Sequence, residues 1–328
     1  MFQAYIRGTG AYLPERVLTN SELEKMVDTS DEWITKRTGI RERHIAAENE
    51  STSDLATHAA RVALENSGLH PEDLDSIIVS TLTPDTLTPA TAVYVQERLG
   101  ARKACAFDLN AACTGFVYGI TVGDSLVASG THKNVLVVGA ETLSRVVDFT
   151  DRNTCILFGD GAGAAVLSRV EEGNPSHVVD NYLRSDGAGW ELICIPAGGS
   201  RRPASVQTVD ERQHFLKMQG REVFKFATRS LAELLETALQ RNGISPEALD
   251  LVIPHQVNYR VIEAALRKVP IPEERFFLNV DRCGNTSAAS VPIALHEAVT
   301  GGRLKKGDLV LFVAFGAGLT WGYNLVRW

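Results

Sequence analysis

The segments PEDLDSIIVS (residues 71–80) and PEALDLVIPH (residues 246–255) are two copies of one unit, separated by a shift of 175 residues. The same shift pairs VLVVGA, which begins at Val135, with VLFVAFG, which begins at Val310. A helical pattern and a basic turn precede each of these runs, and a Gly-rich turn and a last strand follow. A repeated order of this kind predicts a duplicated α/β unit. We place the division in the polar segment EEGNPSH (171–177), which gives an N-terminal half, 1–171, and a C-terminal half, 172–328.

The strands predicted around these repeats are rich in Val, Ile and Leu and do not alternate with polar residues. This pattern is typical of strands that are covered on both faces. Helical patterns such as DLATHAARVALENSG (54–68), AELLETALQRNG (232–243) and VIEAALRKV (261–269) separate them, which predicts the α/β class. The strand candidates are 76–82, 135–141, 163–169, 251–255, 309–315 and 323–328.

The composition is that of a globular enzyme. The chain has 328 residues, of which 44% are hydrophobic and 22% charged, so a large core is available without a disulfide or metal. The net charge of −7 argues against general binding of nucleic acid. We expect no signal peptide, because the first residues do not show a basic region followed by an apolar one. We also expect no membrane span, because no apolar run is as long as a membrane-spanning helix.

The cysteines and histidines indicate neither disulfides nor a metal. The five cysteines form no CxxC pair, and the eight histidines show no metal-ligand spacing. We therefore expect free thiols in a reducing cytoplasm and no metal site.

Cys113 is the first candidate for chemistry. It lies in CAFDLNAACTGF (105–116), between a strand-like run and a helix that opens with small residues. The positive end of a helix favours a thiolate, and small neighbours leave room for a substrate, so the position suits covalent catalysis. The alternative is a small buried core residue.

His255 and Asn285 are the second and third candidates. His255 ends the strand LVIPH in the C-terminal half, at the edge where α/β folds bind ligands. Asn285, in CGNTSAAS (283–290), lies near the repeat-equivalent place of Cys113, so the two residues are predicted to face each other across a pseudo-twofold axis. The alternatives are a structural histidine and an asparagine that caps a helix or forms a turn.

Three motifs, ACTGF around Cys113, PHQVNYR around His255 and GNTSAAS around Asn285, resemble those of β-ketoacyl-acyl carrier protein synthase III, in the thiolase superfamily. FGDGAGAAVL (158–167), AFGAGLTWG (314–322) and DEWITKRTGIRERH (31–44) also match, so the resemblance covers essentially the whole chain. It implies a thiolase-like, duplicated αβαβα five-layer fold, a homodimer, and no cofactor besides the two substrates. The implied reaction is a decarboxylating condensation of an acyl-CoA primer with malonyl-acyl carrier protein, which starts fatty-acid synthesis.

The resemblance implies a role for each motif residue. Cys113 would take the acyl group from CoA, and His255 and Asn285 would donate hydrogen bonds to the malonyl thioester oxygen as CO₂ leaves. The backbone N–H groups of Cys113 and Ala317 would hold the later oxyanion; many relatives carry Gly in place of Ala317, but alanine supplies the same N–H group.

Matched positions extend the expected site to both substrates. Trp33 and Arg152 resemble the pair that holds the CoA adenine, Arg37 would reach a phosphate, and Phe315 would shield the thiol from water in the acyl pocket. The alternative for Trp33 and Phe315 is ordinary packing.

Basic side chains are predicted to dock the acidic carrier protein. Arg260, Arg267 and Lys268 share a face of one predicted helix, and Arg221 and Lys225 match a second contribution. The alternative is a solvated helix face.

Thr88, in LTPDTLTPA, matches a position where acetyl-preferring relatives often carry an aromatic residue that closes the acyl pocket. We therefore expect longer or branched primers to be accepted, unless Leu87 or Tyr94 fills the gap.

Two other functions remain open on the sequence alone. The same chemistry can serve a secondary pathway with an unusual primer. A non-catalytic acyl-binding partner is the second alternative, against which the intact trio Cys113, His255 and Asn285 argues.

Overall fold

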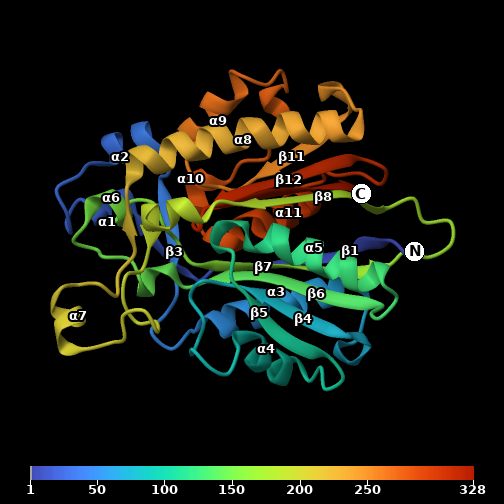
Figure 1. The fold of residues 1–328 in the computed structure, drawn as a ribbon, viewed down its shortest axis with the longest axis horizontal. Coiled ribbons are helices and arrows are strands. Elements are labelled where there is room, and N and C mark those ends of the chain that lie inside the picture. Colours follow the sequence, from blue (N-terminus) through green and yellow to red (C-terminus); the bar gives the residue numbers. More distant parts are fainter. Residues whose placement is uncertain (1) are drawn as a thin grey trace.

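The computed structural model describes residues 2–328 and stacks their elements in five layers that alternate between helix and sheet (Figure 1). One sheet has the order β1-β7-β6-β4-β5 and the other the order β11-β12-β13-β8. The strands of these sheets are β1 (Ala4–Tyr12), β4 (Ser76–Ser80), β5 (Cys105–Leu109), β6 (Asn134–Glu141), β7 (Gly161–Arg169), β8 (His177–Ser185), β11 (Leu251–Pro254), β12 (Leu309–Gly316) and β13 (Thr320–Arg327).

Six helices form the three helical layers. Between the sheets lie α5 (Gly115–Ala128) and α11 (Ser290–Thr300) (Figure 1). The outer face of the first sheet is covered by α3 (Thr52–Ser67) and α4 (Thr91–Leu99). The outer face of the second sheet is covered by α8 (Gly220–Asn242) and α9 (Tyr259–Leu266). The predicted α/β class and the five-layer arrangement are thereby confirmed. Shorter elements are α1 (Asn20–Leu23), α2 (Asp31–Thr38), α6 (Arg152–Cys155), α7 (Val206–Asp210), α10 (Val280–Cys283), β2 (Arg16–Thr19), β3 (Glu42–Ile45), β9 (Ile193–Cys194) and β10 (Lys217–Met218).

The central strands are hydrophobic on both faces because helices cover both faces. Along β6, Val135 and Val137 pack into the core around α5, whereas Leu136 and Val138 pack against α3 on the other side. This explains why the sequence shows continuous apolar runs in place of alternation.

The topology repeats with the shift found in the sequence. β4 pairs parallel with β6, which pairs antiparallel with β7; β11, β12 and β13 pair in the same way. In the middle layer α5 begins at Gly115 and α11 at Ser290, again 175 residues apart. β7 ends at Arg169 and β8 begins at His177, so the segment chosen as the boundary joins the two sheets; the division into 1–171 and 172–328 stays a prediction.

One expected helix is shorter than predicted. The pattern over 261–269 suggests that Arg267 and Lys268 lie within it, but α9 ends at Leu266, and Lys268 lies in the turn that follows. The cause is Pro270, because the residue before a proline avoids helical backbone angles. Lys268 therefore does not share a helix face with Arg260.

Among residues 2–328, no helix combines the length and the hydropathy needed to cross a bilayer. The same residues contain no cluster of three or more His, Cys, Asp or Glu side chains with metal-binding geometry.

Candidate active site

Cys113 lies in a tight turn, and each half of the chain contains one copy of this turn. Its 3₁₀ turn, Ala112–Thr114, leads directly into α5, and the turn Ser287–Ala289 leads in the same way into α11. The first residue of each turn has a positive φ, 46° at Ala112 and 48° at Ser287.

The asparagine before each turn supports it through the same hydrogen bond. Asn285 Oδ1 accepts from Ser287 N–H at 2.9 Å, as Asn110 Oδ1 accepts from Ala112 N–H at 3.2 Å. With the 175-residue shift, the repeat counterpart of Asn285 is Asn110, and that of Cys113 is Ala288. Asn285 is thus near, and not at, the place equivalent to Cys113.

The fold brings the three predicted residues to one cavity between the halves. Cys113, His255 and Asn285 all line it, together with Phe315 and Ala317. The remaining wall is almost wholly apolar and includes Leu82, Leu143, Leu157, Phe158, Ile193, Leu216, Met218, Val223, Phe226 and Val257.

The environment of Cys113 keeps the sulfur protonated at rest. The thiol is partly accessible from the cavity, yet protein surrounds it, and this burial raises the pKa of Cys113 to about 12. A helix N-terminus contributes about 0.3–2 kcal/mol, which offsets less than this shift of about 4 kcal/mol. The α5 end therefore assists a thiolate once it forms and does not create it in the resting protein.

His255 is a neutral imidazole. It is 1% exposed, and burial lowers the pKa of His255 to about 3. Nδ1 lies 2.7 Å from Ser290 Oγ, and the ring meets Phe315 edge-on with centroids 5.7 Å apart. When Ser290 donates to Nδ1, the ring hydrogen is on Nε2, and this tautomer allows His255 to donate a hydrogen bond to a ligand. Ser290 is a functional residue that sequence reasoning missed.

Asn285 is positioned by its backbone and by its amide. Its N–H donates to Leu157 O at 2.8 Å, and its carbonyl accepts from Gly159 N–H at 3.0 Å. Because Oδ1 is occupied by Ser287 N–H, the amide NH₂ group is left to donate toward a ligand.

The end of β12 borders the nucleophile closely. A Cβ added to Gly316 would lie 2.8 Å from Cys113 N and 3.0 Å from Cys113 Cβ, so a side chain at Gly316 would displace the cysteine. Among the turn and loop hydrogen bonds of residues 2–328, neither Cys113 N–H nor Ala317 N–H is a donor. Both groups suit the predicted oxyanion role, which stays a prediction.

Trp33, Arg37 and Arg152 come together at the protein surface. Each guanidinium carbon lies 5.3 Å from the centroid of the Trp33 ring, and Arg152 also donates to Asp28 O at 2.8 Å. A base stacked between Trp33 and Arg152 would need two contact layers of about 3.5 Å each. Adenine binding in this way therefore requires the Arg152 side chain to move.

Three of the five predicted docking residues surround the same entrance. Arg221, Lys225 and Arg260 line a surface depression with Trp33 and Arg37. Leu157 and Met218 line both this depression and the cavity of Cys113, so the entrance leads toward the thiol.

The other two docking candidates lie apart from this depression. Arg267 pairs with Glu263 at 2.7 Å, and Lys268 follows the end of α9; neither lines the entrance.

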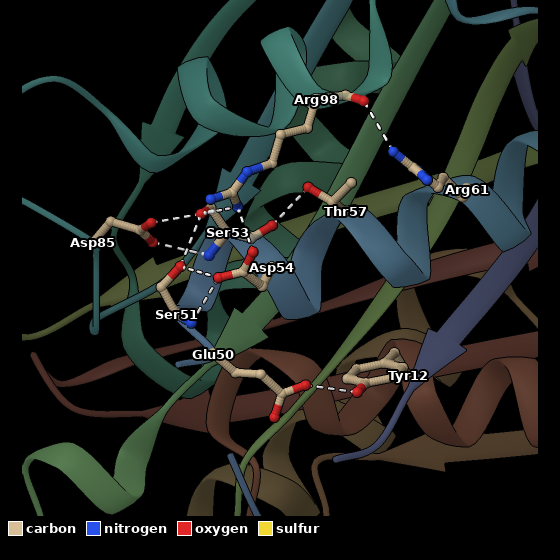
Figure 2. Close-up of polar contacts among 9 residues, drawn as sticks. All are labelled: Tyr12, Glu50, Ser51, Ser53, Asp54, Thr57, Arg61, Asp85 and Arg98. Carbon is tan, nitrogen blue, oxygen red and sulfur yellow. Dashed lines mark hydrogen bonds and ion pairs between the residues drawn. The ribbon is translucent and has the colours of Figure 1, made fainter. Parts of the chain in front are cut away.

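Thr88 is not brought to the cavity within a single chain. It lies in the exposed loop between β4 and α4, and neither it, Leu87 nor Tyr94 lines the cavity. Figure 2 shows how the loop is held: Asp85 accepts from both the backbone N–H and the hydroxyl of Ser53 at the start of α3. The predicted role of Thr88 in the acyl pocket is untested by this arrangement.

A duplicated five-layer fold with Cys, His and Asn in one cavity defines the class of thiolase-like condensing enzymes. The chain matches the family model of 3-oxoacyl-[acyl-carrier-protein] synthase III over residues 107–187, and the model of the C-terminal part of that family over residues 239–328. It is 54% identical over 325 residues to the β-ketoacyl-[acyl-carrier-protein] synthase III of Caldanaerobacter subterraneus subsp. tengcongensis, covering 99% of this chain and 98% of that relative.

Solved structures give the same result. The 3-oxoacyl-[acyl-carrier-protein] synthase III of Aquifex aeolicus VF5 is 50% identical, with a TM-score of 0.91 over 99% of this chain and 100% of that one. The priming β-ketosynthase of the R1128 polyketide pathway is 34% identical, with a TM-score of 0.90 over 99% of this chain and 96% of that one. The chain therefore belongs to the β-ketoacyl-[acyl-carrier-protein] synthase III family and is an acyltransferase.

Proposed function

We propose that this enzyme starts fatty-acid synthesis by condensing an acyl-CoA primer with malonyl-acyl carrier protein, and that Cys113, His255 and Asn285 carry out the two half-reactions. The observation that carries the proposal is the convergence of these three side chains in one apolar cavity. The reaction needs no cofactor beyond its two substrates.

In the first half-reaction, Cys113 attacks the thioester of the primer and becomes acylated. The entrance at Trp33, Arg37 and Arg152 supplies an aromatic face and cations for the nucleotide of CoA. The link through Leu157 and Met218 then guides the thioester toward the sulfur.

In the second half-reaction, malonyl-acyl carrier protein loses CO₂ and negative charge develops on its thioester oxygen. His255 Nε2–H and the amide of Asn285 are donors fixed by Ser290 and Ser287, so they stabilise this charge without reorganising. The resulting carbanion attacks the acyl group on Cys113.

We further propose a homodimer formed through the free edge of the first sheet. Among residues 2–328, β5 pairs only with β4, and the face beside it exposes Leu87 (87%), Val93 (38%) and Phe107 (37%). An unprotected edge strand with apolar neighbours favours pairing with a second copy. Sedimentation of the parent and of Phe107→Lys tests this; a monomeric parent would contradict it.

The free cysteines support a reducing cytoplasm as the location, since none of the five is in a disulfide.

A secondary pathway is the second candidate function, favoured by the similarity to the priming β-ketosynthase. Identity of 50% to 54% with synthases III favours the first.

Arg260→Ala should weaken turnover with malonyl-acyl carrier protein and barely change acylation by acyl-CoA. Arg260 lines the entrance without an ion-pair partner among residues 2–328, so its charge is available to an acidic protein. Added salt should reduce the parent rate toward that of the variant. Arg267→Ala is the matched control, because Arg267 is already paired with Glu263. Equal losses in both half-reactions would point to CoA binding or a damaged fold.

A panel of acyl-CoA primers, read by intact mass and by formation of 3-oxoacyl-acyl carrier protein, tests the proposed function and the role of Thr88. We expect primers longer or more branched than acetyl to react, and Thr88→Phe to shift the kcat/KM ratio toward acetyl-CoA. Each methylene contributes about 0.8 kcal/mol in an apolar pocket, so the shift should be within roughly 10–200-fold. Strict acetyl preference in the parent would show that another residue closes the pocket.

A further inference from the structure

Glu141, the last residue of β6, is a buried carboxylate for which the mechanism above has no role. It is 0% exposed, and it accepts hydrogen bonds from Thr83 Oγ1 at 2.7 Å, Thr81 Oγ1 at 3.1 Å and Leu82 N–H at 3.1 Å. No basic side chain of residues 2–328 forms an ion pair with it. A buried carboxylate without a cation is destabilising, so a purely structural role would be better served by an amide.

The hydroxyl of Ser287 connects Glu141 to the nucleophile. Ser287 is 1% exposed and lines the cavity, and its Oγ makes no well-formed hydrogen bond in the resting structure. Ser287 shares the cavity wall with Cys113, and the turn that it begins packs against β6, where Gly139 lies directly against Ala288. In agreement with this packing, its hydroxyl lowers the pKa of Cys113 and also that of Glu141. A buried hydroxyl without a partner of its own, near both a thiol and a carboxylate, is suited to pass a proton from one to the other.

The internal repeat supports this placement independently. With the shift of 175 residues, the counterpart of Glu141 is Gly316, which lies against the turn of Cys113. Glu141 accordingly lies against the counterpart turn, which begins at Ser287. Gly316, where a side chain would displace Cys113, thus corresponds to the carboxylate of Glu141 in the N-terminal half.

Acylation creates a need for such a group. The Cys113 proton must leave as the sulfur attacks the thioester, because the resting residue is a thiol. His255 is a poor acceptor: Nδ1 is engaged with Ser290, and burial lowers its pKa to about 3. Burial raises the pKa of Glu141 to about 7, which makes it the better base at neutral pH.

We propose that Ser287 relays the Cys113 proton to Glu141 during acylation, and returns it to the sulfur after condensation. This rests on the proposed function. In the first half-reaction the bond from Cys113 Sγ to the acyl carbon forms, the carbon–sulfur bond to CoA breaks, and the leaving thiolate takes a proton from solvent. The Cys113 proton passes to Ser287 Oγ as the Ser287 proton passes to Glu141.

The second half-reaction closes the balance. Malonyl-acyl carrier protein releases CO₂, its carbanion attacks the acyl carbon, and Cys113 departs as a thiolate. Glu141 then returns its proton through Ser287 to the sulfur. The cycle consumes one proton from solvent, released in CoA thiol, as the overall condensation requires.

Glu141→Gln tests the proposal by single-turnover acylation of Cys113 at saturating acyl-CoA across pH 5.5–9. The parent rate should rise as Glu141 ionises and level off above a pH of about 7. Cys113 is the titratable side chain on which the charge of Glu141 acts, and the groups that donate hydrogen bonds to Glu141, from Thr81, Leu82 and Thr83, are neutral. The variant should be at least about 10²-fold slower at pH 8, and its rate should rise with hydroxide without levelling off.

Two effects of opposite sign separate the relay from simple electrostatics. The negative charge of Glu141 raises the pKa of Cys113, so its removal alone would make the thiol more acidic and acylation faster. The relay predicts slower acylation. Glu141→Gln should also raise the melting temperature above that of the parent, and by more at pH 8 than at pH 5. The reason is that the Glu141 carboxyl has a higher pKa in the folded than in the unfolded parent, so its ionisation lowers the parent's stability as pH increases from about 4.5 to 7.

Ser287→Ala is the second variant, and its backbone is compatible with alanine, since Ala112 has the same positive φ in the counterpart turn. It should show the same slow, non-levelling profile. Asp124→Asn is the control: Asp124, on α5, is another carboxyl whose pKa burial raises. It accepts a hydrogen bond from Asn181 on β8 and does not line the cavity, so its variant should keep the parent profile. A parent that is never acylated refutes the proposed function. A parent that is acylated, with Glu141→Gln or Ser287→Ala equally fast, overturns the relay alone.

Discussion

Cys113→Ser is expected to abolish acyl transfer from acyl-CoA, lowering the acylation rate by at least about 10³-fold while the fold stays intact. A serine hydroxyl is much less acidic than a thiol, and neither His255, whose pKa is lowered to about 3, nor Glu141, whose pKa is about 7, is basic enough to activate it. The measurement is the intact mass of the protein after mixing with acyl-CoA. The parent should gain one acyl group and the variant none.

The other cysteines provide the control. Cys105 is exposed and does not line the cavity, and Cys155 and Cys283 are buried. Cys105→Ser should therefore be acylated like the parent. Peptide mapping that places the acyl group on Cys105, Cys155, Cys194 or Cys283 would show that Cys113 is not the nucleophile.

His255→Ala and Asn285→Ala are each expected to slow decarboxylation of malonyl-acyl carrier protein by roughly 10²–10³-fold, which corresponds to about 2.7–4 kcal/mol of lost donor stabilisation. Both variants should still accept an acyl group on Cys113, because neither donor acts on the primer. The measurement is CO₂ release from malonyl-acyl carrier protein beside the intact mass after priming.

The pH dependence gives a further check. Because the pKa of His255 is lowered to about 3, the imidazole stays neutral from pH 5 to 9, and the parent's decarboxylation rate should show no transition near pH 6.5 from this residue. The substitution Asn285→Asp would replace the amide donor by a carboxylate acceptor, so it should slow decarboxylation as much as Asn285→Ala does. Normal decarboxylation in His255→Ala and Asn285→Ala would refute this division of labour.

Much of the fold followed from local pattern. The runs around Ile77, Leu136 and Leu311 are apolar on both faces, which indicated strands between helical layers, and the 175-residue repeat indicated two halves. Cys113, His255 and Asn285 were recognisable because each lies in a short motif at the end of a strand or the start of a helix.

What depends on packing was beyond the sequence. The proposed relay from Glu141 through Ser287 to Cys113, and the observed bond between His255 and Ser290, join residues far apart in the chain, and no local pattern encodes which of them meet. The protonation states depend on packing in the same way. The position of Cys113 at the N-terminus of α5 suggests a thiolate, but burial of the thiol raises its pKa by more than the helix lowers it. The depth of that burial is a property of the assembled halves.

The sequence by itself determined the duplicated α/β fold, six of the strands in its two main sheets and the three motif residues, because these rest on periodicity and short-range spacing; β1 and β8 were not predicted. Only the tertiary structure decided that these residues share one cavity, that its entrance gathers Trp33, Arg37 and Arg260, and that Thr88 lies outside it in a single chain. The physical reason is that desolvation, hydrogen bonding and cavity shape arise where distant segments pack together.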